Sequence, residues 1–190
     1  MNCKNVNSNT CILYFTTGKT VEKSFSFKKR KSLGLQRVLF ERTLNEIKKS
    51  KLAYQINDGT AFGADIFERL NGSIAQIFAS GFQQVILLGD DTPELSAVHI
   101  KQAAKHLENG KVSIGPSNDG GVYLIAFSNA DFNRGILHNL TWHGTSFCGE
   151  LIQNLKRAEI NFEVSKELED LDRAIDLTVY LSKHLKNRLF

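Results

Sequence analysis

The sequence contains few cysteines and no long apolar run. Its three cysteines, Cys3, Cys11 and Cys148, are widely spaced and include no Cys-x-x-Cys pair, which argues against a disulfide framework and a thiolate metal site. The apolar stretch from Cys11 to Phe15 is too short for the core of a signal peptide, and no run approaches the roughly 20 residues of a membrane span. We therefore expect a cytoplasmic protein that does not span a membrane.

The sequence also has little excess of charge of either sign. The 190 residues include 24 Lys and Arg against 20 Asp and Glu, a net charge of +4, and the one dense basic run is Lys28-Lys29-Arg30-Lys31. Nucleic-acid-binding proteins usually concentrate basic charge on one face, often among aromatic side chains. We therefore expect no nucleic-acid partner and interpret the basic run as a solvated surface loop, with the holding of a phosphate as the alternative.

Short apolar runs alternate with longer segments in which apolar residues recur at helical spacing. This pattern predicts strands at residues 11–15, 52–56, 85–88, 111–114, 122–127 and 160–164, and helices at 35–49, 66–78, 96–109, 145–158 and 171–186. Strands that alternate with helices of about ten or more residues are typical of βαβ units and a mainly parallel sheet. We therefore predict an α/β fold with three layers, α/β/α, formed by a single domain that spans residues 1–190.

Ligands of such sheets bind beyond the carboxyl ends of the strands, where three loops have residues suited to chemistry. The first loop places Asp90 and Asp91 directly after the most apolar strand. Two adjacent carboxylates at a buried strand end lose solvation together, and a hard divalent cation such as Mg²⁺ or Mn²⁺ would offset that cost. The alternative is an Asx turn followed by Pro93 at the start of a helix.

The second loop, residues 115–121, is rich in glycine. Gly115, Gly120 and Gly121 permit close approach, so that backbone N–H groups could face the phosphate or carboxylate of a ligand. The alternative is a hairpin turn between two strands.

The third loop contains alternating carboxylates. A turn could bring Asp170 and Asp172 onto one ion, whereas an extended chain would point them to opposite sides. The alternative is that one of them is the N-cap of the last helix, with Asp176 exposed in its first turns.

In this order, the three loops resemble an uncharacterised glycosyltransferase-like family, domain of unknown function 2064, which is associated with radical-SAM and selenium-domain proteins. The family pattern is Gly-x-Asp-x-Pro-x-Leu, Gly-Pro-x-x-Asp-Gly-Gly-x-Tyr-Leu-Ile, a Trp segment and Asp-x-Asp-x-x-x-Asp-Leu. The segments that match it are residues 89–95, 115–125, 140–142 and 170–177, and Phe67-Glu68-Arg69-Leu70 is similar to an upstream Glu-Arg-Leu segment. The resemblance runs from about Phe62 to Leu177.

The resemblance implies the GT-A fold of nucleotide-diphospho-sugar transferases, and a glycosyl- or nucleotidyltransferase that uses a nucleotide or nucleotide-sugar and a small-molecule acceptor. It implies Asp91, Asp170 and Asp172 as ligands of Mg²⁺ or Mn²⁺, which would neutralise a diphosphate and stabilise the leaving group. Asp91 and Asp119 would be catalytic. The residues expected to bind substrate are Gly115, Ser117, Gly120, Gly121 and Trp142.

The segment after the first strand departs from the family. Family members usually have Lys-Thr-Arg-Leu there, whose basic residues would hold nucleotide phosphates, whereas this chain has Thr16 to Lys23 without that motif. Gly18-Lys19-Thr20 is no phosphate-binding loop, because the glycine required earlier is replaced by Leu13. The loss favours the alternative of a non-catalytic relative that serves as a binding or scaffold protein.

Two neighbouring aromatic residues have alternative roles. Trp142 is either a substrate platform or a core or lid residue. His143 is a candidate general base near a metal site, although a lone histidine is more often structural or exposed.

Overall fold

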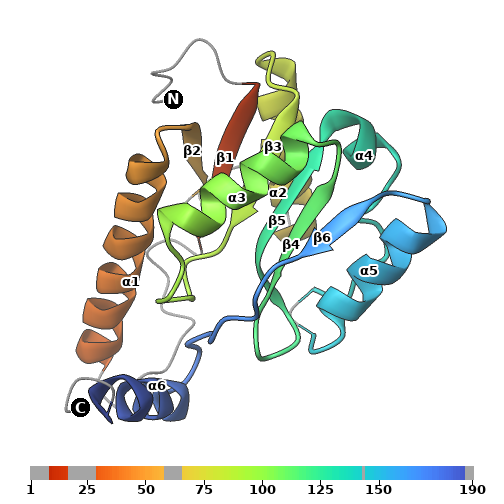
Figure 1. The fold of residues 1–190 in the computed structure, drawn as a ribbon. Coiled ribbons are helices and arrows are strands. Elements are labelled where there is room, and N and C mark those ends of the chain that lie inside the picture. Colours follow the sequence, from red (N-terminus) through yellow and green to blue (C-terminus); the bar gives the residue numbers. More distant parts are fainter. Residues whose placement is uncertain (1–8, 17–28, 58–65, 143, 187–190) are drawn as a thin grey trace.

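The computed structural model describes residues 9–16, 29–57, 66–142 and 144–186, in which helices cover both faces of one six-stranded sheet (Figure 1). The strands are β1 (Thr10–Phe15), β2 (Ala53–Asn57), β3 (Gln84–Leu88), β4 (Val112–Pro116), β5 (Val122–Ser128) and β6 (Phe162–Val164). The helices are α1 (Lys29–Ser50), α2 (Ile66–Ala79), α3 (Ala97–Glu108), α4 (Asn129–Asn133), α5 (Phe147–Arg157) and α6 (Ala174–Lys186). The predicted three-layer α/β/α architecture is confirmed.

The sheet has the strand order β2-β1-β3-β5-β4-β6. β1 is parallel to β2 and β3, and β4 is parallel to β6, whereas β5 is antiparallel to its neighbours β3 and β4. β5 is reversed because a short loop joins it to β4, and only antiparallel strands can be joined that way. The sheet is therefore mostly parallel, as predicted, and the hairpin alternative describes the local geometry of residues 115–121.

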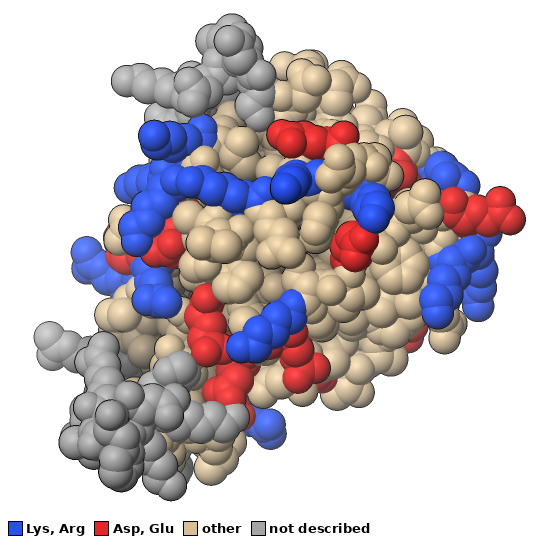
Figure 2. Space-filling model, in the orientation of Figure 1, with Lys and Arg blue, Asp and Glu red and all other residues tan. Residues whose placement is uncertain are grey.

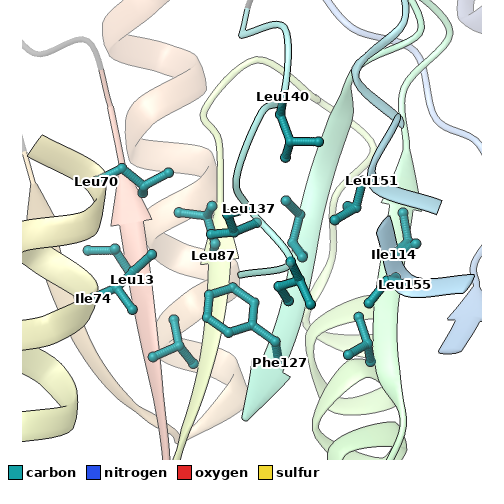
Figure 3. Close-up of a cluster of buried hydrophobic side chains, with 14 of the residues drawn as sticks. Leu13, Leu70, Ile74, Leu87, Ile114, Phe127, Leu137, Leu140, Leu151 and Leu155 are labelled. Carbon is teal, nitrogen blue, oxygen red and sulfur yellow. The ribbon is translucent and has the colours of Figure 1, made fainter. Parts of the chain in front are cut away.

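Strand β3 is buried on both faces, as its continuous apolar sequence predicts. Val85 and Leu87 belong to a core beneath α2 and α5, and Ile86 and Leu88 to a second core beneath α1 and α3. Figure 3 shows the first core, with side chains of α2 and α5 packed against the strands: Leu70, Ile74, Leu151 and Leu155 against Leu13, Leu87, Ile114 and Phe127. Burial of this kind stabilises a fold by roughly 25 cal/mol per Å² of apolar surface, and it holds in place the strand ends that carry the polar loops.

The last helix, α6, lies across the end of α1 (Figure 1). A small apolar cluster joins the two helices. Leu39 of α1 and Leu171, which precedes α6, are buried in it, and Leu35, Leu177 and Tyr180 pack against them. This contact anchors the chain segment that runs from β6 to α6.

Helix α1 begins at Lys29 rather than at Leu35. The interpretation of the basic run as a surface loop is therefore wrong for Lys29 to Lys31, which are helical, while Lys28 lies outside the described residues. The apolar spacing that predicts a helix starts only at Leu35, whereas Lys and Arg are good helix formers that give no such signal. Although α1 has 22 residues, no helix in the part of the chain that the structure describes is both long and apolar enough to cross a membrane.

Two further helices differ from the sequence prediction by more than two residues. α6 begins at Ala174 rather than at Leu171, because the Asp176 carboxylate accepts from the N–H groups of Asp172 and Arg173, which caps the helix there. The short helix α4 was not predicted, although Ser128 and Asp131 form a capping box at its start. A helix of one or two turns has too few residues for apolar periodicity to show.

Candidate active site

Hydrogen bonds join the three predicted loops at the carboxyl edge of the sheet. The Leu171 N–H donates to the Asp91 carbonyl (3.0 Å), which ties the third loop to the first. The Asp170 N–H donates to the side-chain oxygen of Asn118 (3.0 Å), and the Asn118 N–H donates to the Leu168 carbonyl (3.1 Å). The third loop therefore lies between the other two and is bonded to both.

The structure brings three of the predicted carboxylates together. Asp91, Asp170 and Asp172 each offer a carboxylate oxygen, and these oxygens all lie within 4.8 Å of one another. Asp91 and Asp170 are half-buried, and Asp172 is exposed. Several acidic side chains, with a basic one among them, lie over the segment between β6 and α6 (Figure 2). We refer to these three residues as the acidic triad.

The donor set of the acidic triad fits a hard divalent cation. Mg²⁺ takes oxygen ligands at about 2.0–2.1 Å, so neighbouring oxygens on one ion lie roughly 3–4 Å apart. A spread of up to 4.8 Å is slightly wider, so the carboxylates would have to draw together on binding an ion. Carboxylates without thiolate or imidazole favour Mg²⁺ or Mn²⁺ over zinc.

Asp90, the neighbour of Asp91, is not a member of the acidic triad. Its carboxylate accepts a 2.7 Å hydrogen bond from the Thr16 hydroxyl at the end of β1. The Thr92 hydroxyl donates to Asp170 (3.4 Å), so the first loop supplies both a triad carboxylate and a group that orients another. The alternative in which Pro93 starts a helix is wrong, because α3 begins only at Ala97.

Asp176, rather than Asp170 or Asp172, caps the last helix. Its carboxylate accepts hydrogen bonds from the Arg173 N–H (2.7 Å) and the Asp172 N–H (3.2 Å). The alternative that Asp170 or Asp172 is the N-cap, with Asp176 exposed, is therefore wrong. A carboxylate in the first turn stabilises the helix through the same N–H groups and the helix dipole.

Asp119 makes its contacts inside its own loop. Its carboxylate accepts hydrogen bonds from the Ser117 hydroxyl (2.6 Å) and the Gly121 N–H (2.9 Å). The side chain is exposed and does not belong to the acidic triad. The geometry gives Asp119 a role in shaping the loop, and its catalytic role stays a prediction.

Internal packing explains two of the glycines in the second loop. A Cβ atom at Gly115 would lie 2.4 Å from the ring of Tyr123. Gly120 has a φ of +88°, and a Cβ there would lie 2.0 Å from the Thr145 carbonyl oxygen. Both positions therefore require glycine for the fold itself, and the predicted role of Gly115, Gly120 and Gly121 in substrate binding stays a prediction.

Trp142 is half-buried and belongs to an aromatic group. Its ring centroid lies 4.9 Å from that of Phe147 and 6.0 Å from that of Phe67. It lines a pocket with a cavity volume of about 130 Å³, which also borders Gly89 in the first loop. Trp142 thus has features of both roles considered from the sequence. His143 lies outside the described residues.

Glu150, which no sequence pattern marks, holds the Trp142 segment onto α5. Its carboxylate accepts hydrogen bonds from the Thr141 N–H (2.6 Å), the Thr141 hydroxyl (2.9 Å) and the Ser146 hydroxyl (2.8 Å). The Thr141 N–H bond is the main reason that the pKa of Glu150 is lowered. Thr141 and Glu150 are nine residues apart in the sequence, and this spacing does not correspond to a known motif.

Helix α1 supports the first loop through two residues one turn apart, Arg42 and Glu46. The Arg42 guanidinium donates to the Pro93 carbonyl. The Glu46 carboxylate accepts from the Ala97 N–H at the start of α3 (2.9 Å), and a hydrogen bond from Lys49 is the main cause of its lowered pKa. The segment after Asp91 is therefore held at both ends. In the sequence, the only sign of this support is that Arg42 and Glu46 are four residues apart on a predicted helix.

Tyr14 lies close to the first loop and stays neutral. Its hydroxyl donates to the Phe40 carbonyl (3.3 Å), and its ring stacks on that of Phe40 with 5.3 Å between centroids. Burial raises the pKa of Tyr14 far above its ordinary value, and the carboxylates of Asp90 and Asp91 raise it further. Tyr14 therefore acts as a donor and a packing group, which its place in an apolar strand did not reveal.

Solved structures resemble the chain over most of its length. A protein of Desulfovibrio desulfuricans G20, provisionally designated a nucleotide-diphospho-sugar transferase, has a TM-score of 0.80 at 22% identity, covering 91% of this chain and 86% of that one. CMP:2-keto-3-deoxy-manno-octonic acid synthetase in complex with CTP has a TM-score of 0.52 at 10% identity, covering 94% and 99%. Rv0371c of Mycobacterium tuberculosis H37Rv, in complex with manganese, has a TM-score of 0.50 at 13% identity, covering 91% of this chain and 98% of that one. The likeness confirms the predicted nucleotide-diphospho-sugar transferase-like fold.

The sequence itself matches a protein family. No curated protein matches it significantly. The family match covers residues 33–143, so it starts upstream of Phe62 and ends before Asp170 and Asp172, which the geometry alone connects to the site. Because the match spans more than half of the 190 residues, the chain belongs to DUF2064, a family of uncharacterised proteins conserved in bacteria.

Proposed function

We propose that this protein is a divalent-cation-dependent transferase acting on a nucleotide-activated or phosphorylated small molecule, with Mg²⁺ or Mn²⁺ held by Asp91, Asp170 and Asp172. The observation that carries the proposal is the convergence of these carboxylates within 4.8 Å at the carboxyl edge of the sheet. Two proteins of similar fold support it, because one was solved with CTP and the other with manganese.

The cation would supply charge neutralisation, offsetting the phosphate oxygens and stabilising the leaving group. The chain's own residues set the geometry around it. The Leu171 N–H bond to the Asp91 carbonyl holds the first and third loops in register, and the Thr92 hydroxyl orients Asp170. Asp172 is the exposed member of the acidic triad, so a phosphate would approach from its side.

We assign the substrate side of the reaction to the second loop. This loop borders the acidic triad, because the Asn118 side chain accepts from the Asp170 N–H (3.0 Å). Asp119, held by Ser117 and Gly121, is the proposed proton-transfer residue for the acceptor. The residues assigned to substrate binding are Gly115, Ser117, Gly120, Gly121 and Trp142.

The test separates the acidic triad from the rest of the acidic edge. Calorimetry with Mn²⁺ or Mg²⁺, followed by nucleoside triphosphates and nucleoside diphosphate sugars, should show cation binding and cation-dependent binding of one nucleotide class. Asp91→Asn and Asp170→Asn should each weaken cation binding at least about tenfold, since each removes a charged ligand, and tenfold corresponds to about 1.4 kcal/mol. The control, Glu167→Gln, removes a charge from the same exposed segment outside the triad and should bind the cation normally.

Each outcome has a distinct meaning. Absence of cation binding, or equal affinities in Asp91→Asn and Glu167→Gln, would refute the proposed site. With water or a small hydroxyl compound as the acceptor, release of diphosphate from a nucleoside triphosphate identifies nucleotidyl transfer, and release of a nucleoside diphosphate from a nucleotide sugar identifies glycosyl transfer. Cation and nucleotide binding without turnover would identify the non-catalytic relative that the missing Lys-Thr-Arg-Leu motif favours.

A further inference from the structure

We infer that the pocket beside the acidic triad binds an apolar group, about the size of one ring, carried by the phosphate-bearing substrate. The inference rests on the proposed function, because the acidic triad and its cation would hold the phosphate end of the same molecule. It adds a substrate class: phosphate compounds with an aromatic or alicyclic group next to the phosphate, rather than a hydroxyl-rich sugar at that place.

The walls of the pocket are apolar. The residues that line it beside the ends of β3 and β5 are Phe15, Ile66, Leu70, Trp142 and Phe147. Among the described lining residues, none has a charged, amide or aliphatic hydroxyl side chain. Tyr123 has a phenol, but its hydroxyl donates to the Lys166 carbonyl (3.2 Å). A sugar here would lose its hydrogen bonds to water and would find no side-chain partners to replace them. An apolar group has no such hydrogen bonds to lose.

The size of the pocket suits a single ring. Its cavity volume is about 130 Å³, somewhat below the roughly 150 Å³ of an engineered apolar cavity that stays dry and binds benzene. Transfer of a ring from water into such a space is favourable in proportion to the apolar area that both surfaces bury. A benzene-sized or cyclohexane-sized group is therefore of a size that the pocket can hold.

Gly89 connects the pocket with the acidic triad. It lines the pocket and precedes Asp91 by two residues, so their Cα atoms lie at most roughly 7 Å apart. A Cβ atom at Gly89 would meet no atom of the described residues within 4 Å, and its φ lies outside the left-handed region. Among the described residues, neither packing nor backbone conformation thus requires glycine here, in contrast to Gly115 and Gly120. The open space beside Gly89 is available to a molecule that reaches from the triad into the pocket.

Trp142 forms a fixed aromatic wall. Its ring is packed against Phe147 and Phe67, and Glu150 holds the preceding residue, Thr141, through two hydrogen bonds. A wall that is already ordered lowers the entropic cost of binding a flat ring. Trp142 is also the only tryptophan in the chain, so its fluorescence reports on the pocket.

The experiment compares phenyl phosphate with inorganic phosphate and glucose 1-phosphate in the presence of Mn²⁺, by calorimetry and Trp142 fluorescence. Phenyl phosphate should bind at least tenfold tighter than either. Gly89→Val fills the open space and should remove most of this advantage while Mn²⁺ still binds. Gly72→Val, at a helix position where a Cβ likewise meets nothing within 4 Å, should keep it.

The outcomes distinguish this inference from the proposed function. Equal affinities for phenyl phosphate and inorganic phosphate, or an advantage that survives Gly89→Val, would overturn the inference and leave the cation site standing. Absence of Mn²⁺ binding would overturn the proposed function together with the phosphate end of this inference. In that case, a change in Trp142 emission on adding cyclohexanol, lost in Gly89→Val, would still assign the apolar group to the pocket.

Discussion

The start of α3 depends on a neutral histidine, and acid should therefore weaken the fold there. The Ser96 N–H donates to Nδ1 of His99 (3.1 Å), and the Ser96 hydroxyl lies 3.0 Å from the same nitrogen. A backbone N–H can only donate, so Nδ1 must be unprotonated and the ring proton must be on Nε2. Protonation turns Nδ1 into a donor and removes this half of the capping box.

The size and sign of the effect follow from the surroundings of His99. Burial lowers its pKa from the ordinary value of 6.5, Glu94 opposes this shift and Lys166 adds to it. Because the folded-state pKa lies below the unfolded one, the stability is fully present above about pH 6.5 and falls as the pH drops through and below that value. A helix cap contributes typically about 1 kcal/mol, which corresponds to about 2–4 °C in melting temperature for a chain of this length.

The assay is urea unfolding at about pH 7.5 and about pH 5, where the cap should be present and weakened respectively. His99→Gln is the matched control, because a neutral amide oxygen accepts the Ser96 N–H at both pH values. Between the two pH values, the natural protein should lose about 1 kcal/mol more stability than His99→Gln. Other titrating groups contribute equally to both proteins. Equal pH dependences would refute the assignment of the acceptor to Nδ1.

Two further predictions concern glycines and the support of the first loop. Gly149→Ala should stabilise the protein by up to about 1 kcal/mol, because Gly149 lies in α5 where a Cβ meets no atom of the described residues within 4 Å. Gly120→Ala should destabilise the protein, because a φ of +88° strains any residue with a Cβ and the Thr145 carbonyl occupies the space that the Cβ would need. Similar melting temperatures for the two variants would contradict the packing argument. Arg42→Ala, which loses the bond to the Pro93 carbonyl, should weaken Mn²⁺ binding several-fold, with partial recovery in Arg42→Lys. An unchanged Mn²⁺ affinity in Arg42→Ala would show that this bond does not position the acidic triad.

The sequence predicts the strands and helices of this fold well, but not the neighbours of each strand. The apolar run of β3 and the helical spacing in α2 are local signals, and both elements were found within a residue of the prediction. The insertion of β5 between β3 and β4 depends on pairings between segments far apart in the chain. Those pairings are set by packing of whole faces, which no short window of residues records.

The candidate site was predictable only in part, because its assembly depends on backbone hydrogen bonds. The sequence favours Asp91 over Asp90 only through its resemblance to a family motif, and the bond from Thr16 gives the physical reason that Asp90 lies outside the acidic triad. Asp170 and Asp172 are two residues apart and converge because the Leu171 N–H between them is bonded to the Asp91 carbonyl. Any residue type except proline can make such a bond, so the sequence carries no trace of it.

The sequence does not distinguish glycines that the fold requires from a glycine that it does not require. Gly115 and Gly120 lie in a motif that suggests a cradle for substrate, yet the ring of Tyr123 and a positive φ account for them. Gly89 is the first residue of the Gly-x-Asp-x-Pro-x-Leu match and has no role assigned to it from the sequence, yet among the described residues it has open space beside it and no packing requirement. A glycine that the fold requires destabilises the protein when replaced, whereas a glycine that a ligand requires leaves stability intact and changes binding. Gly120→Ala should therefore lower the melting temperature, whereas Gly89→Val should leave it unchanged and weaken phenyl phosphate binding. A loss of stability in Gly89→Val would mean that the space beside it belongs to the fold.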